Sequence, residues 1–334
     1  ECWGANWYGQ LGNGSTTSRS TPLAVASISN AIQVSVGSNS TCAVLISGDV
    51  KCWGYNGQGQ IGDGTNTTRY LPATVVNISN ASEVSVGNDF ACAVRTDATL
   101  SCWGYNNAGQ LGDGTNDSSN FPVDLSLTGV STVGAGDSNA CAVLESGAAK
   151  CWGYNGNRQL GDGTSLNRTS PVSVRSIDNA VVTSSNGQAT CALLATGGIS
   201  CWGNIYSFSN GGDASAYKTP TEITSVSGVS ALALGGNSRC VLHPDATVDC
   251  WGYNHAGQLG DGSTEYANVP QTVPNLDHVE QLVGADYSYC ALLDTGIIEC
   301  WGENGNGQLG NGNTNRQLSP GTVTGISNAT KIVM

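Results

Sequence analysis

Thirteen cysteines are the residues of this chain whose type and spacing point most clearly to chemistry. Twelve of them form pairs ten positions apart, and the second member of each pair begins a Cys-Trp-Gly triplet. A fixed, short spacing favours local disulfide bonds, and it leaves Cys2, which begins the first triplet, without a partner. The predicted pairs are Cys42 and Cys52, Cys92 and Cys102, Cys141 and Cys151, Cys191 and Cys201, Cys240 and Cys250, and Cys290 and Cys300.

Buried free thiols and zinc ligands are the alternatives for these cysteines. Zinc sites need Cys and His clustered at short spacings, and the chain has only three histidines, His243, His255 and His278, none at ligand spacing. We therefore predict six disulfides. Because disulfides persist in oxidising compartments, the protein is predicted to be extracellular, displayed on a cell surface, or periplasmic.

The elements that must position each cysteine pair are β-hairpins. Residues 42–52 alternate in polarity around a turn signal, Ser47-Gly48-Asp49, which is typical of two antiparallel strands. A three-residue loop with glycine in the left-handed position would set Cys42 directly opposite Cys52, close enough for a disulfide. Ala98 and Ala246 replace that glycine in two hairpins, for which the sequence predicts another turn.

The hairpins belong to a repeat of 49 or 50 residues that starts near residues 2, 52, 102, 151, 201, 250 and 300. A period of that length indicates a repeat architecture. Short β-branched runs, abundant glycine and the absence of helical periodicity favour an all-β chain with about four strands per repeat. We expect residues 1–334 to form a single domain.

The phrase CWGYNGQGQIGDG at 52–64, followed by Pro72, Val84-Ser85-Val86-Gly87 and Cys92-Ala93-Val94, resembles the repeat of the regulator of chromosome condensation (RCC1-like) family in its cysteine-bearing bacterial form. The resemblance covers essentially the whole chain. It implies a seven-bladed β-propeller, here with one hairpin disulfide in each of six repeats.

Two departures bear on what the resemblance implies. Family repeats often place a His two residues before the second cysteine position, where this chain has Ser40, Phe90, Asn139, Ala189, Ser238 and Ser288. The family's best-known member is a nuclear exchange factor for a small GTPase and binds chromatin. Because this chain lacks that His, nucleotide exchange is not expected, and because its surface is acidic and it has no basic tail, chromatin binding is not expected either. The last blade lacks a strand within 1–334, the one that would carry the partner of Cys2. We expect residues outside the given sequence, or a neighbouring subunit, to supply that strand.

Composition excludes several classes of function. A net charge of −13 and a pI near 4.4 oppose binding to nucleic acid or to an anionic membrane. No apolar run is long enough to span a bilayer, so no membrane insertion is expected. No Ser/His/Asp order or paired-carboxylate motif recurs, and we predict that the protein is not an enzyme. Asp63, Asp113, Asp162 and Asp261 supply one carboxylate to each Gly-Asp-Gly turn, which favours turn formation over calcium binding, so no cofactor is predicted.

Aromatic residues in loops are the candidates for partner binding, against the alternatives of repeat degeneracy and packing between blades. These candidates are Trp7, Tyr8, Phe90, Tyr206, Phe208, Tyr217, Tyr287 and Tyr289. Eight Asn-X-Ser/Thr sequences are candidate glycosylation sites if the host has the machinery. Their asparagines are Asn13, Asn39, Asn66, Asn77, Asn80, Asn116, Asn167 and Asn328.

The sequence thus predicts an extracellular or cell-surface binding and structural module, a rigid propeller used for protein–protein interaction or adhesion. One alternative is a filament subunit whose incomplete blade a neighbouring chain completes, and another is a carbohydrate-binding lectin. The expected partners are a protein or glycan on a cell surface, or copies of the chain itself.

Overall fold

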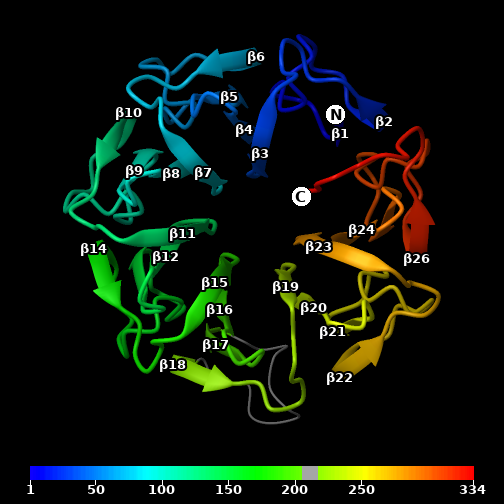
Figure 1. Cartoon of the computed structure of the whole chain (residues 1–334). Coiled ribbons are helices and arrows are strands. Elements are labelled where there is room, and N and C mark those ends of the chain that lie inside the picture. The colour runs from blue at the N-terminus through cyan, green and yellow to red at the C-terminus, as the bar shows by residue number, and fades with distance from the viewer. Residues whose placement is uncertain (205–216) are drawn as a thin grey trace.

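The computed structural model describes residues 1–204 and 217–334, and it shows an all-β propeller. Six antiparallel sheets of four strands and one sheet of two strands stand around a central channel (Figure 1). Within each complete blade the strands follow chain order from the channel to the outer edge of the disc. No helix among the described residues is long and apolar enough to cross a membrane.

The four strand positions of a blade repeat around the ring. Inner strands line the channel: β3 (Ala31–Val36), β7 (Ala81–Val86), β11 (Val130–Ala135), β15 (Ala180–Ser185), β19 (Ala231–Leu234) and β23 (Val279–Ala285). Second strands are the most buried: β4 (Ser40–Leu45), β8 (Phe90–Arg95), β12 (Asn139–Leu144), β16 (Ala189–Leu194), β20 (Ser238–Leu242) and β24 (Ser288–Leu293). Third strands end in the Cys-Trp-Gly triplets: β1 (Cys2–Gly4), β5 (Val50–Gly54), β9 (Leu100–Gly104), β13 (Ala149–Gly153), β17 (Ile199–Gly203), β21 (Val248–Gly252) and β25 (Ile298–Gly302). Outer strands contain the repeated proline: β2 (Arg19–Leu23), β6 (Arg69–Thr74), β10 (Ser119–Asp124), β14 (Arg168–Ser173), β18 (Tyr217–Glu222), β22 (Ala267–Thr272) and β26 (Gln317–Thr322).

All six predicted disulfides are confirmed. Each joins the second and third strands of a blade at directly paired positions, as Cys42 pairs with Cys52 across β4 and β5 with Cα atoms 4.1 Å apart. Ala98 and Ala246 correct one expectation, because both adopt positive φ, 60° and 67°, as Gly48 does at 81°. The Ala98 amide donates to the Arg95 carbonyl just as the Gly48 amide donates to Leu45, so the hairpin turn is unchanged.

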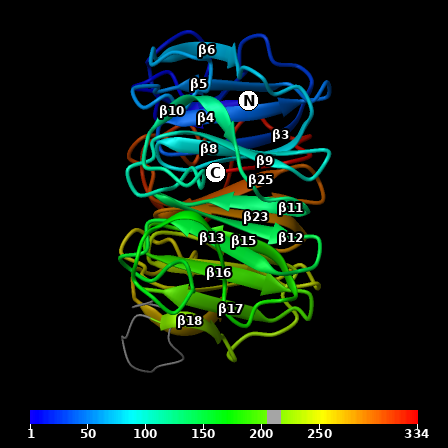
Figure 2. The ribbon, with the colours of Figure 1, turned by 90° about the vertical axis from the view of Figure 1, so that its left-hand side faces the viewer.

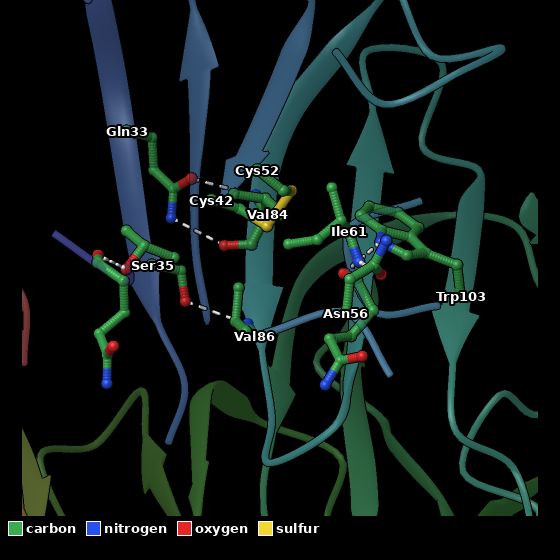
Figure 3. Close-up of a disulfide and its surroundings, with 12 residues drawn as sticks. Gln33, Ser35, Cys42, Cys52, Asn56, Ile61, Val84, Val86 and Trp103 are labelled. Atoms are coloured by element: carbon green, nitrogen blue, oxygen red, sulfur yellow. Dashed lines mark hydrogen bonds between the residues drawn. A yellow bond between two sulfur atoms is a disulfide. The ribbon is translucent and has the colours of Figure 1, made fainter. Parts of the chain in front are cut away.

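The core lies between adjacent blades. One apolar cluster joins Cys42 and Cys52 of the first complete blade to Val84 and Trp103 of the next (Figure 3). Five buried triplet tryptophans donate their Nε1–H to a glutamine carbonyl of the preceding repeat, as Trp103 does to Gln60 at 2.9 Å. Trp3 makes the same bond to Gln308 at 2.9 Å, which closes the ring between the first and last repeats.

The predicted count of seven blades is corrected to six complete blades among the described residues, and the last blade, expected to lack one strand, is a sheet of only two strands. The seventh position holds β1 and β2, while Lys331–Met334 lies beside the last blade without forming a strand. The Ile332 amide donates to Gln281 Oε1 at 3.0 Å, as the Val84 amide donates to Gln33 Oε1 in the first pair of blades. Both termini consequently meet at one junction (Figure 1).

Polar side chains bridge the inner strands, which do not pair with one another directly. Gln33 both donates to the Val84 carbonyl and accepts from the Val84 amide (Figure 3). Glu83 holds the equivalent place in the next blade, where its carboxylate accepts from the Thr132 hydroxyl at 2.9 Å. Burial raises the pKa of Glu83 to about 7, although hydrogen bonds from Thr132 and Val133 and the charge of Lys331 act in the opposite direction.

We expect Glu83→Gln to stabilise the protein at pH 8 by up to about 3 kcal/mol. The folded state holds the Glu83 proton more tightly than the unfolded chain does. The wild-type protein therefore has its full stability below about pH 4.5 and loses the contribution of protonated Glu83 as the pH rises toward 7. Thermal unfolding at pH 5 and pH 8 measures it: the variant should lose less stability than the wild type. Gln33→Glu is the matched control and should gain the same pH dependence. Equal pH dependence in wild type and Glu83→Gln would contradict the prediction.

Candidate functional site

The two faces of the disc carry different loops, because the strands run from one face to the other (Figure 2). One face carries the hairpin turns between second and third strands, such as 46–48 and 96–98. The other carries the loops that lead from inner to second strands, here called the rim loops, and the residue after each Cys-Trp-Gly triplet. Four of those residues are Tyr55, Tyr105, Tyr154 and Tyr253, so we call this surface the tyrosine face.

Backbone contacts fix each tyrosine against a rim loop. The Tyr105 amide donates to the Asp89 carbonyl at 2.9 Å. Gly104, just before it, has φ +109°, and a Cβ there would lie 2.5 Å from the Asp89 carbonyl oxygen. Only glycine allows this approach. The glycine of the triplet is therefore what brings the rim loop and the tyrosine together.

A buried asparagine holds the turn that follows the tyrosine position in six of the seven repeats. Asn6 accepts from the Leu11 amide at 3.0 Å and donates to the Ser15 and Thr17 carbonyls, each at 3.1 Å. The turn between these contacts presents Trp7 and Tyr8 to solvent, with 62% and 41% of their surface exposed. A rigid backbone thus displays two large aromatic side chains.

Aromatic side chains gather in two groups on the tyrosine face. In the first group, the ring centroids of Tyr8 and Tyr55 are 5.0 Å apart, and Trp7 directly precedes Tyr8 in the chain. His255 lies 4.7 Å from Tyr253 and 5.0 Å from Tyr287, between ring centroids. The two groups occupy four consecutive units of the ring, from the blade of β19–β22 to the blade of β3–β6 (Figure 1). We call these six residues the aromatic arc.

Carboxylates border the channel mouth on the same face. Burial raises the pKa of Asp137, and the nearby Asp286 carboxylate raises it further. Burial also raises the pKa of Asp89, although a hydrogen bond from Gln60 Nε2 acts against it. Gly187 lies in the rim loop of the next blade, between β15 and β16. A Cβ at Gly187 would collide with the Asp137 carboxylate, so this glycine makes room for the acidic side chain. Close, partly desolvated carboxylates give this mouth a negative potential.

The structure divides the predicted binding residues. Trp7, Tyr8 and Tyr287 lie exposed on the tyrosine face. Phe90 and Tyr289 are fully buried, so for these two candidates the alternative of packing between blades holds. Tyr217 is half-buried at the start of β18 and packs on the core, and Tyr206 and Phe208 fall outside the described residues.

The two buried aromatic residues lie on second strands and pack between blades, Phe90 against the following blade and Tyr289 against the preceding one. Phe90 joins an apolar cluster that contains Trp152 of the next blade. Tyr289 stacks on Trp301 at 6.1 Å between centroids, and its hydroxyl shares a hydrogen bond with Ser238 at 2.9 Å. Sequence reasoning missed Tyr55, Tyr105, Tyr154 and Tyr253, although their recurrence after the triplet was a visible signal.

The turn carboxylates serve local structure. Asp63 accepts from the Thr65 amide at 3.0 Å and hydroxyl at 2.7 Å, and it forms an ion pair with Arg69 at 2.6 Å. Asp162 makes the equivalent contacts with Thr164 and Arg168. Within 1–204 and 217–334, no group of three or more His, Cys, Asp or Glu side chains could hold a metal ion.

The candidate glycosylation sites differ in exposure. Asn13, Asn39 and Asn80 are half-buried. Asn66, Asn77, Asn116, Asn167 and Asn328 are exposed. The side chains of Asn66, Asn116 and Asn167 already form hydrogen bonds to the backbone, so Asn77 and Asn328 are the most available.

Cys2 is a free, half-buried thiol, and burial raises its pKa.

These features define a disulfide-stapled β-propeller with an aromatic and acidic face. The profile of the RCC1-like domain family matches residues 1–284, and that of the regulator of chromosome condensation (RCC1) repeat matches residues 300–334. The chain therefore belongs to the RCC1-like family. A search of curated proteins finds no match.

Solved structures show the same fold at low sequence identity. Human WBSCR16 is 21% identical with a TM-score of 0.89, covering 99% of this chain and 95% of its own. Prp20p from Saccharomyces cerevisiae is 17% identical with a TM-score of 0.86, covering 97% of this chain and 85% of its own. The CRINKLY WD40 ectodomain of the Arabidopsis thaliana receptor kinase ACR4 is 18% identical with a TM-score of 0.51, covering 81% and 79%.

Proposed function

We propose that this protein is an extracellular or cell-surface scaffold that binds a partner protein through its tyrosine face. The observation that carries the proposal is the aromatic arc, because exposed aromatic residues on a rigid frame supply binding area at low entropic cost. Tyr70 on β6 lies against Gly9 of the turn that carries Trp7 and Tyr8, whereas Phe121 is the single exposed aromatic residue of the outer strand β10. Relatives support a protein partner, since Prp20p has described binding properties to Gsp1p and histones, and Kap60 is bound to yeast RCC1 in a crystal.

Six disulfides support a location outside the reducing cytosol. The ectodomain of the receptor kinase ACR4 uses a related architecture in a receptor. Acid quenching of cells that make the protein, followed by thiol alkylation, tests the location. We expect one alkylated cysteine per chain without reduction, and thirteen after it.

The binding face is tested by a photo-crosslinking amino acid placed in cells at Trp7 or Tyr253, with Ile46 on the opposite face as control. Ile46 is 75% exposed, so it is at least as accessible as the test positions. We expect discrete protein adducts from Trp7 and Tyr253 and none from Ile46. Adducts from Ile46 alone, or equal yields from both faces, would overturn the proposal.

No catalytic step belongs to this proposal. The filament and lectin alternatives stay predictions, because no feature of the described residues favours either over protein binding.

A further inference from the structure

We propose that the partner of the tyrosine face presents a cationic segment, rich in Lys or Arg, that lies between the aromatic arc and the channel mouth. This inference rests on the proposed function, because it names the chemical class of that partner. Three observations carry it: the carboxylates of this face, the position of the cations, and the aromatic rings beside the carboxylates.

Four carboxylates of the tyrosine face form no ion pair with any described residue. Five ion pairs occur among the described residues, and none includes Asp89, Asp137, Asp286 or Glu303. Glu303 occupies the tyrosine position of the last repeat, where its amide donates to the Tyr287 carbonyl at 2.9 Å. Gly187 lies against the Asp137 carboxylate, and the neighbouring Asn186 side chain donates to the Gly235 carbonyl at 2.7 Å. The Gly236 amide in turn donates to the Asp286 carbonyl at 2.8 Å, so these loops bring Asp137 and Asp286 to the same part of the mouth, where the Asp286 charge raises the pKa of Asp137. A bound cation would relieve that repulsion.

The cations of this region lie away from the channel mouth. Arg316 donates to the His255 carbonyl at 2.9 Å, at the outer margin of the face. Arg158, in the turn after Tyr154, already takes part in an interaction within the chain. Lys331 lies near Glu83 of an inner strand, and its charge lowers the pKa of that carboxyl. The face therefore offers negative charge that no ion pair among the described residues neutralises.

Aromatic rings stand beside those carboxylates. Tyr287 follows Asp286 directly and is 37% exposed, while Tyr253 is 43% exposed on the far side of His255. A Lys or Arg side chain can bind a carboxylate with its charged end and lie over an aromatic ring within about 6 Å. Nucleic acid would be repelled by this face, and a neutral glycan would not engage its charges.

The experiment uses a fluorescein-labelled peptide in which Gly alternates with Lys or Arg. Fluorescence anisotropy measures its binding to the protein at low and at high NaCl. The double variant Asp137→Asn/Asp286→Asn should weaken binding at least 10-fold, and Tyr253→Ala/Tyr287→Ala should also weaken it. Binding to the wild type should fall with salt, because surface electrostatics are screened over about 10 Å at 0.1 M. A peptide with Glu in place of Lys and Arg should not bind.

The matched control is Asp97→Asn/Asp245→Asn, which changes the net charge by the same amount on the opposite face. Both side chains are exposed in hairpin turns and accept from Thr99 or Thr247, a contact that Asn can keep. This control should bind like the wild type. Equal losses in both double variants would show that only net charge matters and would overturn the inference, as would absence of binding. If crosslinking at Trp7 and Tyr253 still captures a partner in that case, the proposed function stands and only the cationic class fails.

Discussion

Replacement of both Cys92 and Cys102 by alanine is expected to lower the free energy of unfolding by about 2–3 kcal/mol, because the bridge closes a short loop. Both cysteines are fully buried, with Cα atoms 4.0 Å apart, so alanine leaves no unpaired polar group. Reduction of all six bridges removes more than about 10 kcal/mol if the effects add, which is comparable to the whole stability of a typical domain. The reduced protein is therefore expected to unfold at room temperature.

Circular dichroism with and without dithiothreitol measures this effect. The oxidised chain should melt cooperatively, the Cys92→Ala/Cys102→Ala variant several degrees lower, and the reduced chain should show no transition. A reduced chain that melts within a few degrees of the oxidised one would show that blade packing alone maintains the ring.

Asn106→Ala is expected to cost about 3 kcal/mol or more, because one buried side chain satisfies several backbone groups. Asn106 is fully buried and accepts from the Leu111 amide at 2.9 Å. Its Nδ2 donates to the Thr115 carbonyl at 3.3 Å and to the Asp117 carbonyl at 3.0 Å. Alanine would leave these groups buried without partners and would loosen the turn.

Urea unfolding measures the loss, and the neighbouring Asn107→Ala is the control. Asn107 is exposed, its side-chain amide donates to the Tyr105 hydroxyl, and its backbone carbonyl accepts from Asn116 in the same turn. Removal of the Asn107 side chain should therefore change the free energy of unfolding by less than about 0.5 kcal/mol. If the two variants were equally stable, the asparagine would not be what holds the turn. Because Asn6 plays the same part beneath Trp7 and Tyr8, the result also bears on how the binding face is held.

Local chemistry in the sequence predicted much of this fold. Cysteines ten residues apart around a turn can reach each other in almost any hairpin, so the pairing of Cys42 with Cys52 needed no knowledge of other blades. The turn at Ala98 could not be predicted in the same way. Its positive φ costs roughly 1 kcal/mol relative to glycine, and the paired strands and disulfide on either side outweigh that cost.

The binding face was predicted only in part. Trp7 and Tyr8 stand in a turn that interrupts the repeat, and they are exposed as expected. Phe90 and Tyr289 stand at successive positions near the start of their second strands, close to loops, yet neighbouring blades bury both completely. Burial of a side chain at a blade interface depends on a surface about 50 residues away in the chain, and alternation within one strand does not reveal it.

By itself the sequence determined the all-β class, the repeat, the six bridges and the acidic charge, because each follows from spacing, turn chemistry or composition within one repeat. Only the tertiary structure decided that the seventh position holds two strands and that the aromatic arc and the Asp137–Asp286 pair share one face. The physical reason is that these arrangements come from packing one blade against the next around a ring, which brings together residues whose distance in the sequence says nothing of their distance in space.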